Sequence, residues 1–216
     1  VWPAAAGPDV LFVPHTLYDG RMSTPPCVAA EAINGRPVVR FARETDLLSL
    51  PGFASQAFGG KAFTFFVVSQ SSDPEFGLSG NAANGGGGIP RLYLMRQAFV
   101  YDQFSGSARI AGVGSDPQVL VYEHDGDRNL KAFRATDVQG QAEQVVVPEF
   151  GAGGALSVPF WAGNKPHPGD LAEVAMFDRL LTEAERNSVV AYLDGKYRLG
   201  RFPIWELRPS VGAETE

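Results

Sequence analysis

Three oxygen-bearing side chains stand at alternate positions in one short polar segment. Asp125, Asp127 and Asn129 follow an apolar run, and Gly126 separates the first two. Carboxylate and amide oxygens are the ligands that calcium prefers, so this spacing predicts a calcium site at the rim of a sheet. Calcium loops usually continue to a further acidic ligand, whereas here Lys131 follows. A solvated hairpin turn is therefore the alternative interpretation.

The same segment contains the carboxylates that could carry out hydrolysis. A glycosidase that retains stereochemistry places two acids about 5 Å apart. Glu123, Asp125 and Asp127 alternate, but the intervening glycine favours a turn over a catalytic strand. Tyr122, Glu123 and His124 are too few to define a lyase site, and no nucleophile elbow, Walker loop or dinucleotide motif occurs. We therefore assign no catalytic residue, and a hydrolase or lyase stays a third hypothesis.

A second segment has the composition of a sugar-binding site. Sugars are bound by apolar and aromatic surfaces flanked by hydrogen-bonding groups. Trp161, Asn164 and His167 supply an aromatic ring, an amide and an imidazole close together in sequence. They are the predicted carbohydrate-binding residues. Phe160 and Trp161 would face opposite sides of a strand, so a core position for Trp161 is the alternative.

Composition excludes several classes of partner. The chain has 18 Lys and Arg against 24 Asp and Glu, a net charge of −6, and no basic cluster. Nucleic acid and anionic membrane surfaces both need such a cluster. No apolar stretch approaches the roughly 18 residues that span a bilayer, so membrane insertion is not expected. The one cysteine, Cys27, can form no internal disulfide and is predicted to be a small buried residue.

Short apolar runs between turn formers predict about nine or ten strands. The clearest run, 61–70, is aromatic and β-branched and is expected to be buried on both faces. Asn34-Gly35 predicts a tight turn, and Asp125-Gly126 predicts a hairpin. The segment 71–88, which ends in four glycines, is predicted to be a loop. The predicted strands span 9–13, 28–33, 37–41, 61–70, 119–123, 130–134, 142–147, 156–161 and 169–178, together with 92–95 and 98–101, which form either a strand pair or one long bent strand.

One helix is predicted, over about residues 183–197. Thr182 and Glu185 form the sequence pattern of a capping box, in which each side chain bonds the other residue's backbone N–H. Val189, Leu193 and Tyr197 then recur at helical spacing and are expected to face the core.

The last third of the chain resembles the closing segment of bacterial laminin-G-like domains of the concanavalin A-like superfamily. The matching residues are Gly169-Asp-Leu-Ala-Glu-Val-Ala-Met-Phe-Asp-Arg-Leu-Leu-Thr-Glu-Ala-Glu-Arg186 and the helical pattern of Tyr192, Leu193, Lys196, Tyr197 and Leu199. Asn34-Gly-Arg-Pro-Val-Val-Arg-Phe41, Asp46-Leu-Leu-Ser-Leu50 and Phe63-Thr-Phe-Phe-Val-Val68 are similar to earlier motifs of the family. The sequence departs from the family's Asp-Gly after Phe41, where it has Ala42-Arg43-Glu44.

This resemblance implies an all-β fold: a two-sheet antiparallel jelly-roll sandwich, concanavalin A-like, with one short helix near the C-terminal end. We expect an N-terminal arm or linker over 1–8, the sandwich domain over 9–200 and a C-terminal extension over 201–216. The expected function is non-catalytic recognition of carbohydrate or a surface protein, outside the cell or at its surface. The alternative is a structural subunit of a surface assembly, which would self-associate through Trp2 and Phe202–Leu207.

Overall fold

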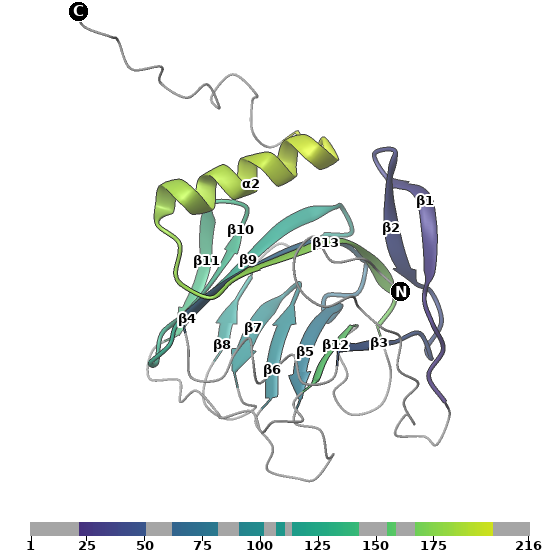
Figure 1. Ribbon diagram of the computed structural model, residues 1–216, viewed down its shortest axis with the longest axis horizontal. Coiled ribbons are helices and arrows are strands. Elements are labelled where there is room, and N and C mark those ends of the chain that lie inside the picture. Colours follow the sequence, from purple (N-terminus) through teal and green to yellow (C-terminus); the bar gives the residue numbers. More distant parts are fainter. Residues whose placement is uncertain are drawn as a thin grey trace, which may run out of the picture.

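Two antiparallel sheets and a helix make up the part of the chain that the structure describes (Figure 1). It is a computed structural model and describes residues 22–50, 62–81, 91–101, 107–110, 114–142, 155–158 and 167–200. In spatial order, the seven-stranded sheet contains β1 (Cys27–Ile33), β2 (Arg36–Phe41), β13 (Gly169–Phe177), β4 (Ala62–Gln70), β9 (Gln118–Asp125), β10 (Leu130–Arg134) and β11 (Asp137–Ala142). The six-stranded sheet contains β3 (Leu48–Leu50), β12 (Ala155–Val158), β5 (Gly77–Asn81), β6 (Arg91–Met95), β7 (Ala98–Tyr101) and β8 (Ser107–Arg109). The predicted sandwich is confirmed.

The seven-stranded sheet is the middle of three layers. Its inner face packs on the six-stranded sheet, and its outer face is covered by helix α2 (Glu183–Tyr197), as Figure 1 shows. Successive side chains of β4 therefore enter two different clusters: Phe65 lies between the sheets and Phe66 lies under the helix. This explains why the strand is buried on both faces, as predicted. No helix among the described residues is long and apolar enough to cross a membrane.

The predicted turns are present. Asn34 and Gly35 have φ of 48° and 78°, the left-handed conformations that a tight hairpin turn requires, and they join β1 to β2. The hairpin of β9 and β10 and the strand pair of β6 and β7 are also confirmed.

Several strands differ from the prediction. β5 lies inside the segment predicted as a loop. The sequence did not predict this strand because it is rich in glycine and small polar residues and has one large apolar side chain, Leu78. β3 and β8 are strands of three residues each, and no sequence pattern predicted them. β11 begins at Asp137, before the strand predicted over 142–147, whose remainder lies outside the described residues.

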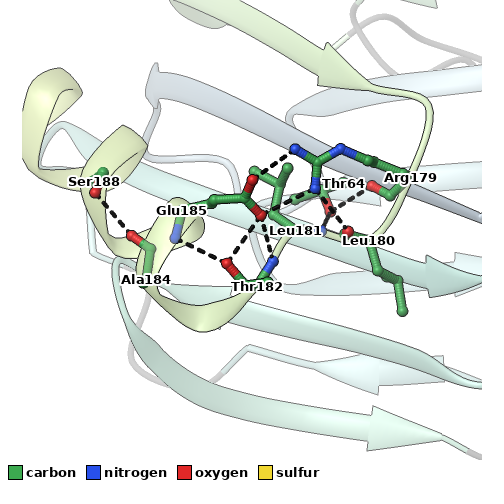
Figure 2. A network of polar contacts seen from close by, with 8 residues as sticks. All are labelled: Thr64, Arg179, Leu180, Leu181, Thr182, Ala184, Glu185 and Ser188. Atoms are coloured by element: carbon green, nitrogen blue, oxygen red, sulfur yellow. Dashed lines mark hydrogen bonds and ion pairs between the residues drawn. The ribbon is translucent and has the colours of Figure 1, made fainter.

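The start of α2 is held by a polar network (Figure 2). Glu185 Oε2 accepts the Thr182 N–H at 2.8 Å, and the Glu185 N–H donates to Thr182 Oγ1 at 3.3 Å, so the predicted capping box is confirmed. Arg179 adds two bonds to the same carboxylate, at 2.7 and 3.0 Å. These hydrogen bonds lower the pKa of Glu185 to about 2, and the bond from Arg179 has the largest effect. Thr64 on β4 ties the network to the sheet by bonding Arg179 O and the Leu181 N–H.

The end of α2 is capped by the hairpin of β1 and β2. Asn34 Nδ2 donates to the carbonyls of Tyr197 and Arg198 at 3.0 and 3.1 Å, and Arg36 Nε donates to the Lys196 carbonyl at 3.2 Å. The last carbonyls of a helix have no partner within it, and a positive charge near them is favourable. Two segments that are about 160 residues apart in the sequence therefore meet at this point.

One glycine of the closing pattern is explained by packing. A Cβ on Gly169 would lie 2.6 Å from the ring of Phe76, which is fully buried against Phe41. A Cβ on Gly195, in α2, would meet nothing within 4 Å.

We expect opposite effects from alanine at these two glycines. Gly169→Ala forces Phe76 aside and should lower the free energy of unfolding by about 1–3 kcal/mol. Gly195→Ala should raise it by about 0.5–1 kcal/mol, because it removes backbone freedom from the unfolded chain. Urea denaturation of the two variants measures both values. Equal shifts of the same sign would contradict the packing described for Phe76.

Candidate functional site

The turn between β9 and β10 is organised around one carboxylate. Asp125 Oδ1 accepts the backbone N–H groups of Asp127 and Arg128 at 2.9 Å and that of Asn129 at 3.0 Å. The side-chain amide of Asn129 donates to Asp125 Oδ2. Partial burial acts to raise the pKa of Asp125, but the hydrogen bonds from Asn129, Asp127 and Arg128 outweigh it and lower the pKa to about 2.

This geometry bears on the predicted calcium residues. Asp125 and Asn129 are brought together, but Asn129 presents its nitrogen to Asp125. Asp127 is exposed and lies 3.7 Å from the Arg128 guanidinium. Within the described ranges, no group of three His, Cys, Asp or Glu side chains is arranged to hold a metal ion. Calcium binding at Asp125, Asp127 and Asn129 stays a prediction.

The residues considered for lyase chemistry are held apart on two faces of β9. Tyr122 is buried between the sheets, where its hydroxyl donates to the Met95 carbonyl at 2.9 Å and burial raises its pKa. His124 is also buried, stacks on Phe63, and accepts the Gly126 N–H at Nδ1. Burial lowers the pKa of His124, and this effect is larger than that of the Asp125 charge, which acts to raise it. Glu123 faces the other way, as alternation in a strand requires.

Glu123 forms a buried ion pair with the helix. Arg186 Nη1 lies 3.0 Å from Glu123 Oε1, and the two side chains are only 12% and 7% exposed. The Arg186 guanidinium also lies 4.3 Å from the centre of the Phe133 ring, within the range of a cation–π interaction. Glu123 therefore helps to dock α2 on the sheet.

A groove of about 410 Å³ opens beside this ion pair. Glu123, Lys131 and Gln141 are directly opposite one another on β9, β10 and β11, so their side chains form a row across one face of the sheet. The lining consists of Glu123, Asp125, Asn129, Leu130, Lys131, Gln141 and Leu180. Figure 2 shows that the Leu180 side chain points away from the network around Thr182. The groove combines an exposed apolar side chain with an ammonium, two amides and two carboxylates.

Sequence reasoning missed Lys131, Gln141 and Leu180. The alternation of β10 was visible, but the partner of each residue depends on the strand register. Register was not predictable for β11, whose start was misplaced.

His167 lies elsewhere, between two carboxylates. Its Nδ1 is 2.7 Å from Asp73 Oδ2, and its Nε2 is 3.3 Å from Glu75 Oε2. Asp73 Oδ1 accepts the Glu75 N–H, and Ser71 Oγ donates to the Pro168 carbonyl at 2.6 Å. The cluster joins the β4–β5 connection to the start of β13. Trp161 and Asn164, predicted to bind sugar with His167, lie outside the described residues.

Cys27 is exposed, so its predicted burial was wrong. The residue begins β1, an edge strand, and its sulfur has only a weak contact, 3.9 Å, with the Arg40 carbonyl. Trp2 and Phe202–Leu207, predicted to mediate self-association, lie outside the described residues.

Comparison with known proteins finds solved structures with a similar fold. No protein-family model matches the chain, and no curated protein matches it. Domain 4 of AbnA, a GH43 extracellular arabinanase from Geobacillus stearothermophilus, in complex with arabinotriose, has a TM-score of 0.59 at 10% identity, over 78% of this chain and 82% of that one. The Ruminococcus gnavus IT-sialidase CBM40 bound to α2,3-sialyllactose has a TM-score of 0.53 at 11% identity, over 71% and 96%.

A glycosidase is also similar. Trypanosoma rangeli sialidase has a TM-score of 0.52 at 14% identity over 78% of this chain, which spans only 30% of the sialidase. At these identities the likeness concerns the fold. The chain is a β-sandwich of the kind found in carbohydrate-binding and glycosidase domains.

Proposed function

We propose that this sandwich is an extracellular carbohydrate-binding module of the laminin-G-like kind. The observation that carries the proposal is the extent of the structural match. The match spans 82% and 96% of two modules solved with a sugar bound, but only 30% of a sialidase. This coverage supports a sugar-binding unit over a complete catalytic chain.

The groove beside the β9–β10 hairpin is the proposed sugar site. Ligand sites are concave and join apolar surface to a few fixed polar groups. Leu180, 41% exposed, offers apolar contact to a sugar ring. Lys131 and Gln141 extend from neighbouring strands and can bond hydroxyl or carboxylate oxygens. Hydrogen bonds within the turn hold the Asp125 carboxylate in place, and the ion pair with Arg186 holds that of Glu123. Binding therefore does not have to order the acidic side of the groove.

Binding should be measured first with arabinotriose and α2,3-sialyllactose, and then with a wider glycan panel. For any sugar of the panel that binds, we expect Lys131→Ala and Gln141→Ala each to weaken the binding by about tenfold. Each variant loses one hydrogen bond, which contributes about 1.4 kcal/mol. Isothermal titration calorimetry gives the dissociation constants. The control is Glu31→Ala on β1, which should leave affinity unchanged.

A variant at the second candidate site tests the placement. If His167→Ala abolishes binding while Lys131→Ala and Gln141→Ala do not change it, the sugar lies with His167, Trp161 and Asn164, and the groove is the wrong site. A chain that binds no sugar in the panel contradicts the proposed function itself.

A further inference from the structure

The turn between β1 and β2 contains a residue pair that can react with itself. Asn34 is followed by Gly35, and both residues are exposed. The backbone nitrogen that follows an asparagine can attack the side-chain carbonyl carbon, and glycine hinders this attack least because it has no Cβ. A Cβ on Gly35 would meet nothing within 4 Å, so the space beside the pair is open. The turn therefore has the components of a deamidation site.

Deamidation of this pair needs no reactant other than water. First, a bond forms between the Gly35 nitrogen and Asn34 Cγ, and the bond from Cγ to the amide nitrogen breaks. Ammonia leaves with the proton that Gly35 loses, and a five-membered succinimide remains. Water then opens the ring at either carbonyl carbon. One opening gives aspartate at position 34, and the other gives isoaspartate, in which the main chain continues through the side-chain carboxyl carbon.

In the folded chain, the end of α2 holds the reacting amide. Asn34 Nδ2 donates to the Tyr197 and Arg198 carbonyls at 3.0 and 3.1 Å. Two carbonyl partners identify this atom as the amide nitrogen, which is the leaving group. The attack turns the side chain toward the Gly35 nitrogen and therefore breaks both bonds. Deamidation thus requires the amide to separate from the end of the helix.

We propose that Asn34 is a deamidation site guarded by α2, and that the reaction prevents the helix end from docking again on the hairpin. The product has a carboxylate in place of the amide, and a carboxylate has no hydrogen to donate to the two carbonyls. Its negative charge also lies at the negative end of the helix dipole. Arg36 bonds the Lys196 carbonyl, so a carboxylate that attracted this guanidinium would remove another bond from the helix end. Isoaspartate lengthens the main chain of the tight turn by one atom.

The rate of deamidation tests whether α2 guards the site. Peptide mass spectrometry measures it, because both products are heavier than the amide. Asn34 in the folded full chain should react at least about tenfold more slowly than in the same chain in urea, since only an open population reacts. Asn84-Gly85 is a second pair of the same composition. In urea the two pairs should react at similar rates, which shows that the local sequence does not slow the reaction of Asn34.

Two tyrosines of α2 provide matched variants. The Tyr197 hydroxyl bonds the Ala172 carbonyl at 3.1 Å and the Glu173 carboxylate at 2.9 Å, and so holds the last turn of α2 on β13. Tyr197→Phe should loosen this turn and accelerate deamidation by about tenfold, the effect of losing a buried hydrogen bond. Tyr192→Phe is the control, because Tyr192 is 58% exposed, and it should leave the rate unchanged. Amides of β4 that stay protected from exchange in both variants show that the sandwich remains folded.

The consequence of the reaction is tested with Asn34→Asp, which imitates one product. Asn34→Gly removes the amide without adding a charge and still permits the positive φ of this position. The Leu199 N–H bonds the Asp194 carbonyl at 3.0 Å and reports on the end of α2. It should exchange with deuterium at least about tenfold faster in Asn34→Asp than in the unmodified chain, and Asn34→Gly should lie between them.

Two results would overturn the proposal. One is deamidation of Asn34 that is as fast in the folded chain as in urea, or that Tyr197→Phe does not accelerate, because α2 then does not guard the site. The other is unchanged exchange of the Leu199 amide in Asn34→Asp, because a carboxylate at position 34 then does not release the helix end.

Discussion

Arg186→Met should lower the free energy of unfolding by about 3–5 kcal/mol, because removing one member of a buried ion pair leaves the other charge buried without compensation. Glu123 is 7% exposed, and α2 covers it. Methionine keeps most of the apolar stem over Phe133 but loses the cation–π contact. Urea denaturation, followed by far-ultraviolet circular dichroism, measures the change.

A matched arginine and a double variant separate charge from packing. Arg179→Met breaks the Arg179–Glu185 pair, whose side chains are 53% and 43% exposed, and should shift the midpoint only slightly. Arg186→Met combined with Glu123→Gln should recover much of the lost stability, since no uncompensated charge stays buried. If Arg186→Met costs no more than Arg179→Met, the ion pair does not dock α2.

Leu193→Ala should cost about 2–5 kcal/mol through lost burial and the cavity that it leaves. Leu193 is 1% exposed and belongs to the cluster that joins α2 to Phe66 and Phe133. Tyr192→Ala is the control, because Tyr192 precedes Leu193 in the same helix and is 58% exposed. Thermal and urea unfolding of both variants give the comparison. Equal losses at the two positions would contradict the docking of α2 through this face.

Features with local signals were predictable from the sequence. A capping box needs two residues three apart, and the helix begins at Glu183 and ends at Tyr197, as expected. A tight turn needs residues that tolerate positive φ, which Asn34 and Gly35 do. Helical spacing correctly predicted the burial of Leu193. Val189, predicted in the same way, is only partly buried, and Val190, which the spacing did not single out, is fully buried.

Features that depend on strand pairing were not predictable. The row of Glu123, Lys131 and Gln141 exists because of the registers of two strand pairs. Cys27 was expected inside because free cysteines usually are, but its exposure depends on β1 being an edge strand. β5 has a loop-like composition and becomes a strand through its pairing with β6 and β12.

The charged residues of the closing pattern hold the helix on the sheet. Lys196 pairs with Glu173 at 2.7 Å, and Tyr197 donates to the same carboxylate at 2.9 Å. Arg179 and Arg186 have the partners described above. These contacts are structural, so the charged residues of the pattern serve to hold the helix and not to bind a ligand. The proposed groove combines one residue of the pattern, Leu180, with residues outside it, among them Lys131 and Gln141.

The most direct test of sugar recognition is an amide chemical-shift titration of the intact, isotope-labelled chain with arabinotriose and with α2,3-sialyllactose. The proposal predicts saturable shifts for at least one sugar, concentrated at Asn129, Lys131 and Gln141. The amides of β1 and those around His167 should not move. Saturable shifts centred on His167 would contradict the placement in the groove, and no saturable shift with either sugar or the wider panel would contradict carbohydrate binding.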